Sequence, residues 1–118
     1  MAVYINETEG LRHVLNKEQL YMRLLKKFKA DVSLDALTSA VTAQDYTKAE
    51  IEAHTIKGIS GNLALTELFN QIQALDTALK AKIAQPDGDV ITPESLAPLH
   101  TCFQHTLTSI DEALARHV

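Results

Sequence analysis

A histidine, a lysine and two glycines fall within one short stretch, residues 53–65, and their types suit the handling of a phosphoryl group. The stretch runs Ala-His-Thr-Ile-Lys-Gly-Ile-Ser-Gly-Asn-Leu-Ala-Leu. An exposed imidazole at His54 is largely neutral at pH 7 and is then a nucleophile. Lys57 could neutralise an anion held by that imidazole, as a compact point charge. Gly58 and Gly61 carry no side chain, so they would let another molecule approach the histidine closely.

The same stretch is predicted to form the second half of a helix over about Tyr46–Leu63. Asp45 is its expected N-cap, because a short carboxylate can accept hydrogen bonds from the free N–H groups of a first helical turn. At about 100° per residue, a helical projection places three apolar residues on the side opposite the histidine: Ile56, Ile59 and Leu63. His54 is therefore expected on an outward face.

That outward face is predicted to be a docking surface. Within roughly 40° of the histidine in projection lie four residues: Thr47, Gly58, Gly61 and Leu65. Lys57 lies about 60° to one side. An interior glycine destabilises a helix by about 0.5–1 kcal/mol relative to alanine. We interpret the two glycines as positions without side chains that give a partner access to the histidine.

The run Ala-His-x-Ile-Lys-Gly-x-x-Gly-x-Leu resembles the phosphorylation-site helix of histidine phosphotransfer (HPt) domains. The resemblance covers most of the chain, because Leu20–Phe28 looks like the preceding helix of that family and Leu68–Leu79 like the following one. One position departs from the pattern. Near the turn out of the histidine helix the family usually has a glycine, and this chain has Ala64.

This resemblance implies a two-component phosphorelay. His54 Nε2 would attack an aspartyl phosphate on a response-regulator receiver domain and then pass the group to the aspartate of a second receiver. Lys57 would pair with the phosphoryl oxygens, and the glycine-bearing face would dock the receiver. The implied partners are receiver domains and a hybrid sensor histidine kinase. The chain would need no cofactor and no metal of its own, since the receiver would bring Mg²⁺.

Asp76 falls inside the apolar stripe of the helix that follows, and a carboxylate is costly to bury without a partner. It could lie at the edge of the stripe and reach water, or it could pair with Lys80, one turn further on. Alternatively, it could accept a hydrogen bond from Nδ1–H of His54, which would leave Nε2 free to react. HPt domains often carry Glu or Gln in that role at the matching position.

The chain as a whole is predicted to be all-α, an antiparallel up-down four-helix bundle with a short additional N-terminal helix, in a single domain over residues 1–118. Apolar residues recur at helical spacing in most windows and seldom alternate. Besides the histidine helix, we expect helices over about 7–15, from about 17 with a break near 30–34, over about 66–83, and from about 95.

Two further helix starts are predicted from capping residues. Thr66 is the expected N-cap of the helix after the histidine helix. For the last helix, Ser95 as the cap would place Pro98 in the first turn, where its missing N–H matters little. A short turn followed by a restart is the other possibility. The expected seam of this helix comprises Leu96, Leu99, Phe103, Leu107, Ile110 and Leu114.

Composition limits the choice of partners and compartment. The formal charge is −4 and 46% of the 118 residues are hydrophobic, with charges of both signs interspersed. No basic stripe indicates nucleic acid, and no apolar run approaches the roughly 20 residues of a membrane span. Cys102 is the single cysteine, and the first seven residues lack the features of a secretory signal, so we expect a cytoplasmic protein. A monomer is expected.

Two other classes of function stay open. The first is a module that binds receivers and transfers nothing, which His54 and Lys57 argue against. The second is a small enzyme, such as a phosphohistidine phosphatase or a metal-dependent hydrolase. We find no Walker-type phosphate loop, kinase signature or Mg²⁺ carboxylate cluster, so autonomous kinase activity is not expected. Cys102 and His105 are three apart on a helix, but two ligands make a weak metal site.

Overall fold

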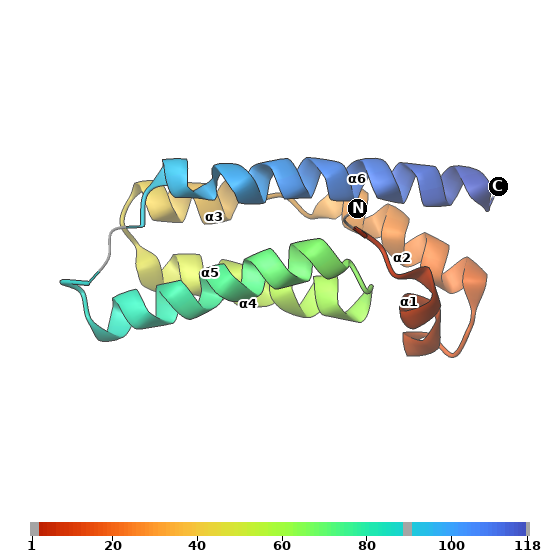
Figure 1. Ribbon diagram of the computed structural model, residues 1–118, viewed down its shortest axis with the longest axis horizontal. Coiled ribbons are helices and arrows are strands. Elements are labelled where there is room, and N and C mark those ends of the chain that lie inside the picture. The colour runs from red at the N-terminus through yellow and green to blue at the C-terminus, as the bar shows by residue number, and fades with distance from the viewer. Residues whose placement is uncertain (1–2, 89–90, 118) are drawn as a thin grey trace.

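The computed structural model describes residues 3–88 and 91–117, and the regular elements in these ranges are helices (Figure 1). In chain order they are α1 (Glu7–His13), α2 (Glu18–Asp31), α3 (Asp35–Thr42), α4 (Tyr46–Asn62), α5 (Thr66–Ala84), a 3₁₀ turn η1 (Pro93–Leu96) and α6 (Ala97–Arg116). The predicted all-α bundle with a short first helix is therefore confirmed.

The long arms of the bundle alternate in direction (Figure 1). The first arm is α2 followed by α3, and α4, α5 and α6 are the other three. α4 and α5 form a hairpin; α3 packs on α4, and α6 packs on both α2 and α5. The expected break near residues 30–34 is confirmed, because Val32 ends α2 in an extended conformation with φ −97° and ψ 131°.

The core lies between these arms and follows the predicted apolar stripes. α2 buries Tyr21, Leu25 and Phe28, and the ring of Phe28 meets that of Phe103 on α6 with centroids 5.9 Å apart. The predicted seam of the last helix is buried or partly buried throughout: Leu96, Leu99, Phe103, Leu107, Ile110 and Leu114. Burial of these residues supplies the main driving force for assembling the bundle.

The start of the last helix follows the alternative of a short turn and a restart. Thr92, not Ser95, is the capping side chain: its hydroxyl accepts a hydrogen bond from the Ser95 backbone N–H at 3.3 Å. The 3₁₀ turn η1 follows, and α6 restarts with Pro98 in its first turn. The prediction that Ser95 caps the last helix was wrong, because Pro93 favours a helical turn that begins before Ser95.

The predicted cap of α5 was also wrong by one residue. Thr66 is the first residue of α5, and Leu65 precedes it without a capping side chain. The Thr66 hydroxyl donates instead to the carbonyl oxygen of Val3 at 2.6 Å. A contact with a distant part of the chain therefore replaced the local cap that the sequence indicated.

The chain leaves α4 through Ala64, whose φ of 57° lies in the left-handed region. The N–H of Ala64 bonds to the carbonyl of Gly61 at 3.2 Å, and the N–H of Leu65 bonds to that of Ser60 at 2.9 Å. This pair of bonds is a Schellman motif, in which glycine is the usual left-handed residue. Ala64 occupies the position at which the sequence departs from the HPt pattern, and a side chain in this conformation costs about 1–2 kcal/mol.

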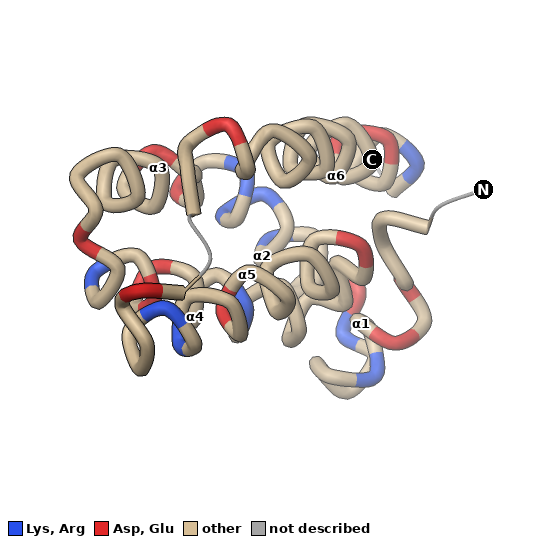
Figure 2. Tube along the Cα trace, turned by 60° about the vertical axis from the view of Figure 1, so that its left-hand side comes forward, with Lys and Arg blue, Asp and Glu red and all other residues tan. Residues whose placement is uncertain are grey.

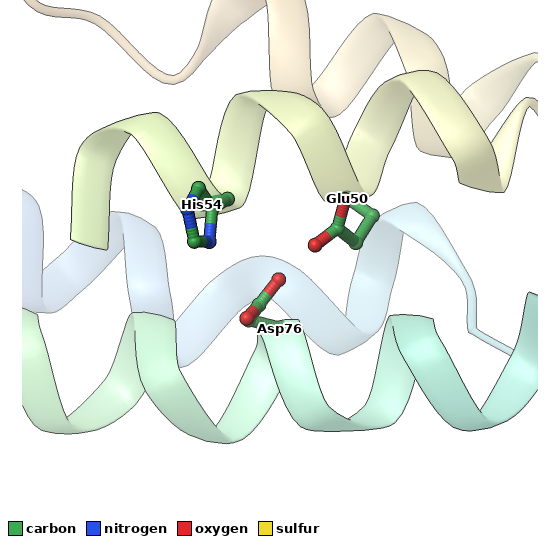
Figure 3. Close-up of side chains that lie close together, drawn as sticks. All are labelled: Glu50, His54 and Asp76. Atoms are coloured by element: carbon green, nitrogen blue, oxygen red, sulfur yellow. The ribbon is translucent and has the colours of Figure 1, made fainter. Parts of the chain in front are cut away.

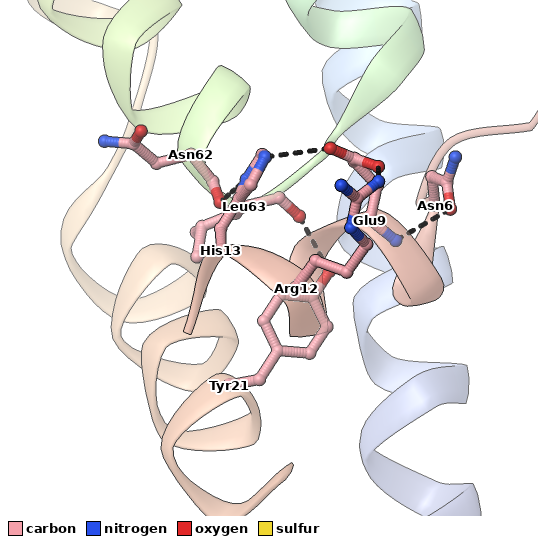
Figure 4. Close-up of polar contacts among 7 residues, drawn as sticks. All are labelled: Asn6, Glu9, Arg12, His13, Tyr21, Asn62 and Leu63. Atoms are coloured by element: carbon pink, nitrogen blue, oxygen red, sulfur yellow. Dashed lines mark hydrogen bonds and ion pairs between the residues drawn. The ribbon is translucent and has the colours of Figure 1, made fainter. Parts of the chain in front are cut away.

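The next carbonyl oxygens at this end of α4 accept hydrogen bonds from the N-terminal part of the chain (Figure 4). The oxygen of Asn62 accepts from His13 Nδ1 at 2.9 Å, that of Leu63 from the Tyr21 hydroxyl at 2.7 Å, and that of Ala64 from the Asn6 N–H at 2.9 Å. Because these groups would otherwise lack intrahelical partners, α1 and α2 fix the end of α4.

Tyr21 reaches Leu63 only because Gly10 has no side chain. A Cβ at Gly10 would lie 2.3 Å from the Tyr21 hydroxyl oxygen. Burial, reinforced by the negative charge of Glu7, raises the pKa of Tyr21 to about 12. The hydroxyl therefore stays protonated and donates to the helix end over the whole physiological range.

Charges of both signs are distributed along the helices (Figure 2). Among residues 3–88 and 91–117, no helix combines the length and apolar content that crossing a bilayer requires.

Candidate functional site

His54 lies on the exposed side of α4, near its middle. The helix begins as predicted, since the Asp45 carboxylate accepts a hydrogen bond from the Lys48 N–H at 3.1 Å. Ala53 and Ile56, on either side of the histidine in sequence, are buried at 0% and 4% exposure and anchor the helix to the core. This anchoring presents the imidazole outward on a fixed element.

Asp76 comes to the histidine from α5, the neighbouring helix of the hairpin. Figure 3 shows the carboxylates of Asp76 and Glu50 turned toward the same space as the His54 ring. One ligand atom from each of these residues lies within 4.8 Å of the other two. Asp76 is only 1% exposed. The structure thus brings together the two residues that the sequence analysis joined, and it adds Glu50.

Two lysines surround the Asp76 carboxylate. Lys57 Nζ lies 3.7 Å from Asp76 Oδ2, and Lys80 Nζ lies 3.2 Å from the same oxygen. Lys80 also lies 3.9 Å from Glu50 Oε1. Beside the imidazole there are therefore two cations and two carboxylates, and the formal charges of these four groups cancel.

The second carboxylate oxygen of Asp76 is not engaged. Asp76 Oδ1 is buried and makes no hydrogen bond to any residue in the described ranges. A buried carboxylate oxygen without a donor is unfavourable, and it is available to a donor that turns toward it. No hydrogen bond joins His54 to Asp76 within residues 3–88 and 91–117, so the orienting role of Asp76 stays a prediction.

The two glycines of the predicted docking face occupy different surroundings. A Cβ added to Gly58 would meet nothing within 4 Å, so this position opens to solvent. A Cβ added to Gly61 would lie 3.2 Å from the ring of Phe69 on α5. Thr47 is exposed. Gly58 and Thr47 therefore leave the histidine face open, whereas Gly61 lets α4 and α5 pack closely.

Leu65 does not belong to this face, and its prediction as a docking residue was wrong. It is 0% exposed and sits in the core cluster. The helical projection that placed it beside His54 does not apply to it, because α4 ends at Asn62 and the left-handed Ala64 redirects the chain.

Glu50 and Lys80 were not assigned roles at the site from sequence. Glu50 is four residues before His54 on one helix, a spacing that places two side chains on the same face. This spacing is the sequence signal that points to Glu50. Lys80 was considered only as an ion-pair partner of Asp76, and its proximity to Glu50 depends on how α5 packs against α4.

The other candidate metal pair is not supported as a site. Cys102 is buried, and burial raises the pKa of its thiol, which disfavours the thiolate that binds metals. His105 Nδ1 shares a hydrogen bond with the Tyr4 hydroxyl at 2.9 Å. In residues 3–88 and 91–117, the group of three or more potential ligands is Glu50, His54 and Asp76.

Comparison with known proteins yields one match. The model of the family described as "Hpt domain" matches residues 23–116, which covers α3, α4, α5, α6 and the part of α2 from residue 23 onward. No curated protein and no solved structure matches the chain.

Proposed function

Since the chain belongs to the Hpt domain family, and so is a phosphotransfer module of two-component signalling, we propose that it relays a phosphoryl group through His54 between the aspartates of receiver domains. The observation that carries this proposal is the exposed His54 on α4, with Lys57 one turn away and open space at Gly58. The proposal gives the chain no kinase activity of its own.

In the first step, a nitrogen of the neutral His54 ring attacks the phosphorus of an aspartyl phosphate. The N–P bond forms, the bond between phosphorus and the aspartyl oxygen breaks, and the carboxylate leaves with the electron pair. The other ring nitrogen keeps its N–H during the attack, and its proton can afterwards pass to solvent or to a nearby carboxylate. Asp76, whose Oδ1 has no donor, is the candidate for holding that N–H. Transfer to a second receiver is the same step reversed.

In this proposal, Lys57 and Lys80 neutralise the charge of the transferred group. Both now pair with Asp76, at 3.7 Å and 3.2 Å, and both side chains are flexible and partly exposed. When three phosphoryl oxygens arrive at His54, either ammonium can turn toward them as a point charge. In phosphoryl transfer, positioning and charge neutralisation carry most of the catalysis. The receiver would supply Mg²⁺ and its own catalytic groups.

The docking surface in this proposal is the open part of the α4 face. Thr47 and Gly58 present little bulk around His54, so a receiver can bring its aspartate to the ring. The partners in the proposal are receiver domains and a sensor kinase that carries one. Such complexes are transient, and a small interface is sufficient for them.

The test is a transfer assay with a panel of receiver domains phosphorylated by a small-molecule donor. Wild type and His54→Gln are mixed with each receiver, and protein-bound label and binding are followed in parallel. The proposal expects acid-labile, alkali-stable label on wild type only. Binding without label across the panel would favour a receiver-docking module that transfers nothing. Turnover of a generic phosphate ester by the isolated chain would favour a small enzyme.

A further inference from the structure

We propose that Glu50, His54 and Asp76 form a binding site for a divalent transition-metal ion of the Zn²⁺ class, and that the bound ion blocks His54 as a phosphoryl acceptor. Metal binding is inferred only from the geometry and chemistry of this site and does not rest on the proposed function. The effect of the bound ion on phosphotransfer does rest on the function proposed above.

The geometry of the three side chains is close to that of a metal site. Their nearest ligand atoms lie within 4.8 Å of one another (Figure 3). Ligands about 2.0–2.2 Å from a tetrahedral ion are separated by roughly 3.4 Å, so small side-chain rotations would close the site. Glu50 and His54 are four residues apart on α4, the spacing by which one helix face supplies two metal ligands.

The buried carboxylate of Asp76 gives a second, independent indication. Asp76 is 1% exposed, and its Oδ1 has no hydrogen-bond partner in residues 3–88 and 91–117. The two ammonium groups near this carboxylate lie at its other oxygen, Oδ2. A buried carboxylate oxygen without a hydrogen-bond partner is unfavourable, and a cation at Oδ1 would satisfy it. This oxygen belongs to the carboxylate that faces the His54 ring and Glu50 in Figure 3.

The ligand types select the class of ion. One imidazole and two carboxylates suit Zn²⁺ and similar transition metals, whereas Mg²⁺ and Ca²⁺ prefer sets made only of oxygen. Because His54 is exposed, water can complete the coordination. The ion that binds here therefore differs from the Mg²⁺ that the proposed receiver would carry.

The two lysines oppose this binding and give it a diagnostic signature. Lys80 lies 3.2 Å from Asp76 Oδ2 and 3.9 Å from Glu50 Oε1, so the ion must displace this ammonium group from two of its ligands. Lys57 lies 3.7 Å from Asp76 Oδ2 and opposes the ion at one ligand. The Lys80 side chain is 57% exposed and can move away into solvent. Removing the charge of Lys80 should therefore tighten metal binding, which a site formed elsewhere on the chain would not show.

The consequence for phosphotransfer follows from the electron count of the ring. A neutral imidazole has one nitrogen with a lone pair and one that carries a proton. When the lone pair is bound to a metal ion, no nucleophilic nitrogen remains to attack an aspartyl phosphate. Metal binding and phosphorylation at His54 are therefore mutually exclusive.

The first experiment is calorimetric titration of the full chain with Zn²⁺ alone. Wild type should bind one ion, with affinity reduced at least about tenfold in Glu50→Gln and in His54→Gln. Lys80→Ala should bind roughly three- to tenfold more tightly. His100→Gln is the control, since His100 lies at the Thr38 hydroxyl on another face and should leave binding unchanged.

Absence of binding by wild type would overturn the proposal. Binding that persists in both Glu50→Gln and His54→Gln would do the same, because the ion would then sit at another site.

The second experiment measures phosphorylation of the chain by a receiver, with and without Zn²⁺. With free Zn²⁺ at about ten times the Kd of wild type, the rate should fall about tenfold for wild type and at most about twofold for Glu50→Gln. The comparison with Glu50→Gln corrects for any effect of Zn²⁺ on the receiver. An equal fall in rate for the two proteins would refute the block. Zn²⁺ binding to a chain that no receiver phosphorylates would leave the metal site standing and count against the proposed relay.

Discussion

Lys57 Nζ lies 3.7 Å from Asp76 Oδ2, so the cation predicted to bind a phosphoryl group is held beside the carboxylate predicted to orient the histidine. The two predicted roles are therefore coupled. Lys80 shares the same carboxylate at 3.2 Å. Asp76 thus keeps two cations near His54 before any phosphoryl group arrives, and charges placed in advance need little reorganisation during transfer.

Replacing Asp76 should impair phosphorylation more than folding. In Asp76→Ala both lysines lose their common partner and the imidazole loses its nearest buried acceptor. We expect phosphorylation of His54 to slow roughly ten- to a hundredfold, the range for losing a carboxylate that supports a functional imidazole. Rates with one receiver should be compared with those of Asp87→Ala, a change in an exposed loop. Equal rates for wild type and Asp76→Ala would show that the carboxylate is only structural.

Gly58→Ala should separate stability from function. The added Cβ meets nothing within 4 Å, so the helix should gain about 0.5–1 kcal/mol from the better propensity of alanine. The same methyl group would stand on the docking face and slow transfer from a receiver. Gly61→Ala is the matched variant, and it should gain less because its Cβ would lie 3.2 Å from Phe69. Denaturant unfolding and transfer rates measure both effects, and faster transfer by Gly58→Ala would contradict the docking face.

Ala64→Gly should stabilise the protein. Ala64 has a φ of 57°, a conformation that destabilises a residue with a side chain by about 1–2 kcal/mol. Glycine would relieve this strain. It would also raise the entropy of the unfolded chain, which lowers stability by only roughly 0.4–1 kcal/mol. A net gain of roughly 0.5–1 kcal/mol is expected in urea unfolding. Ala74→Gly, at an exposed position within α5, should instead lose about that amount. Loss of stability in both variants would contradict a strained exit from α4.

Stability should fall as the pH rises through the titration of His117. This ring pairs with Glu18 and with Glu7, which is also paired with Arg116, and joins the end of α6 to α1 and α2. Its hydrogen bonds to Glu18 and Glu7 raise the pKa of His117 in the folded state. In the folded state His117 thus keeps its proton to a higher pH than in the unfolded chain. Its contribution to the free energy of unfolding is therefore complete below about pH 6.5 and is lost as the pH rises through the pKa of the folded state.

His117→Gln should remove this part of the pH dependence. The thermal unfolding midpoint should depend less on pH across the neutral range for His117→Gln, and it should keep the pH dependence of wild type for His100→Gln. The same slope in all three proteins would assign the pH dependence to other groups.

Local features of the site could be predicted from sequence, and those that depend on packing between helices could not. Asp45 caps α4 and His54 faces outward because both follow from one helical segment. Asp76 was found because a carboxylate interrupts an apolar stripe. In contrast, the contact of Lys80 with Glu50 depends on how α5 is rotated against α4.

Errors occurred where the chain departs from a regular helix. Leu65 was projected onto the docking face although α4 had already ended, and the core takes it up. Thr66 was expected to cap α5, but its hydroxyl bonds to Val3, 63 residues away in sequence. The fit of Gly10 against Tyr21 had no sequence signal at all, since only the packed structure brings these residues together.

The most direct test of the account is to locate the phosphoryl group after a pulse from one labelled receiver and to chase it with a second, unlabelled receiver. The account predicts label on His54 in wild type, its passage to the second receiver during the chase, and no label at any time on His54→Gln. His13→Gln and His100→Gln, which alter other exposed histidines, should behave as wild type. Label that persists on His54→Gln, or label on wild type that no receiver can remove, would contradict a relay through His54.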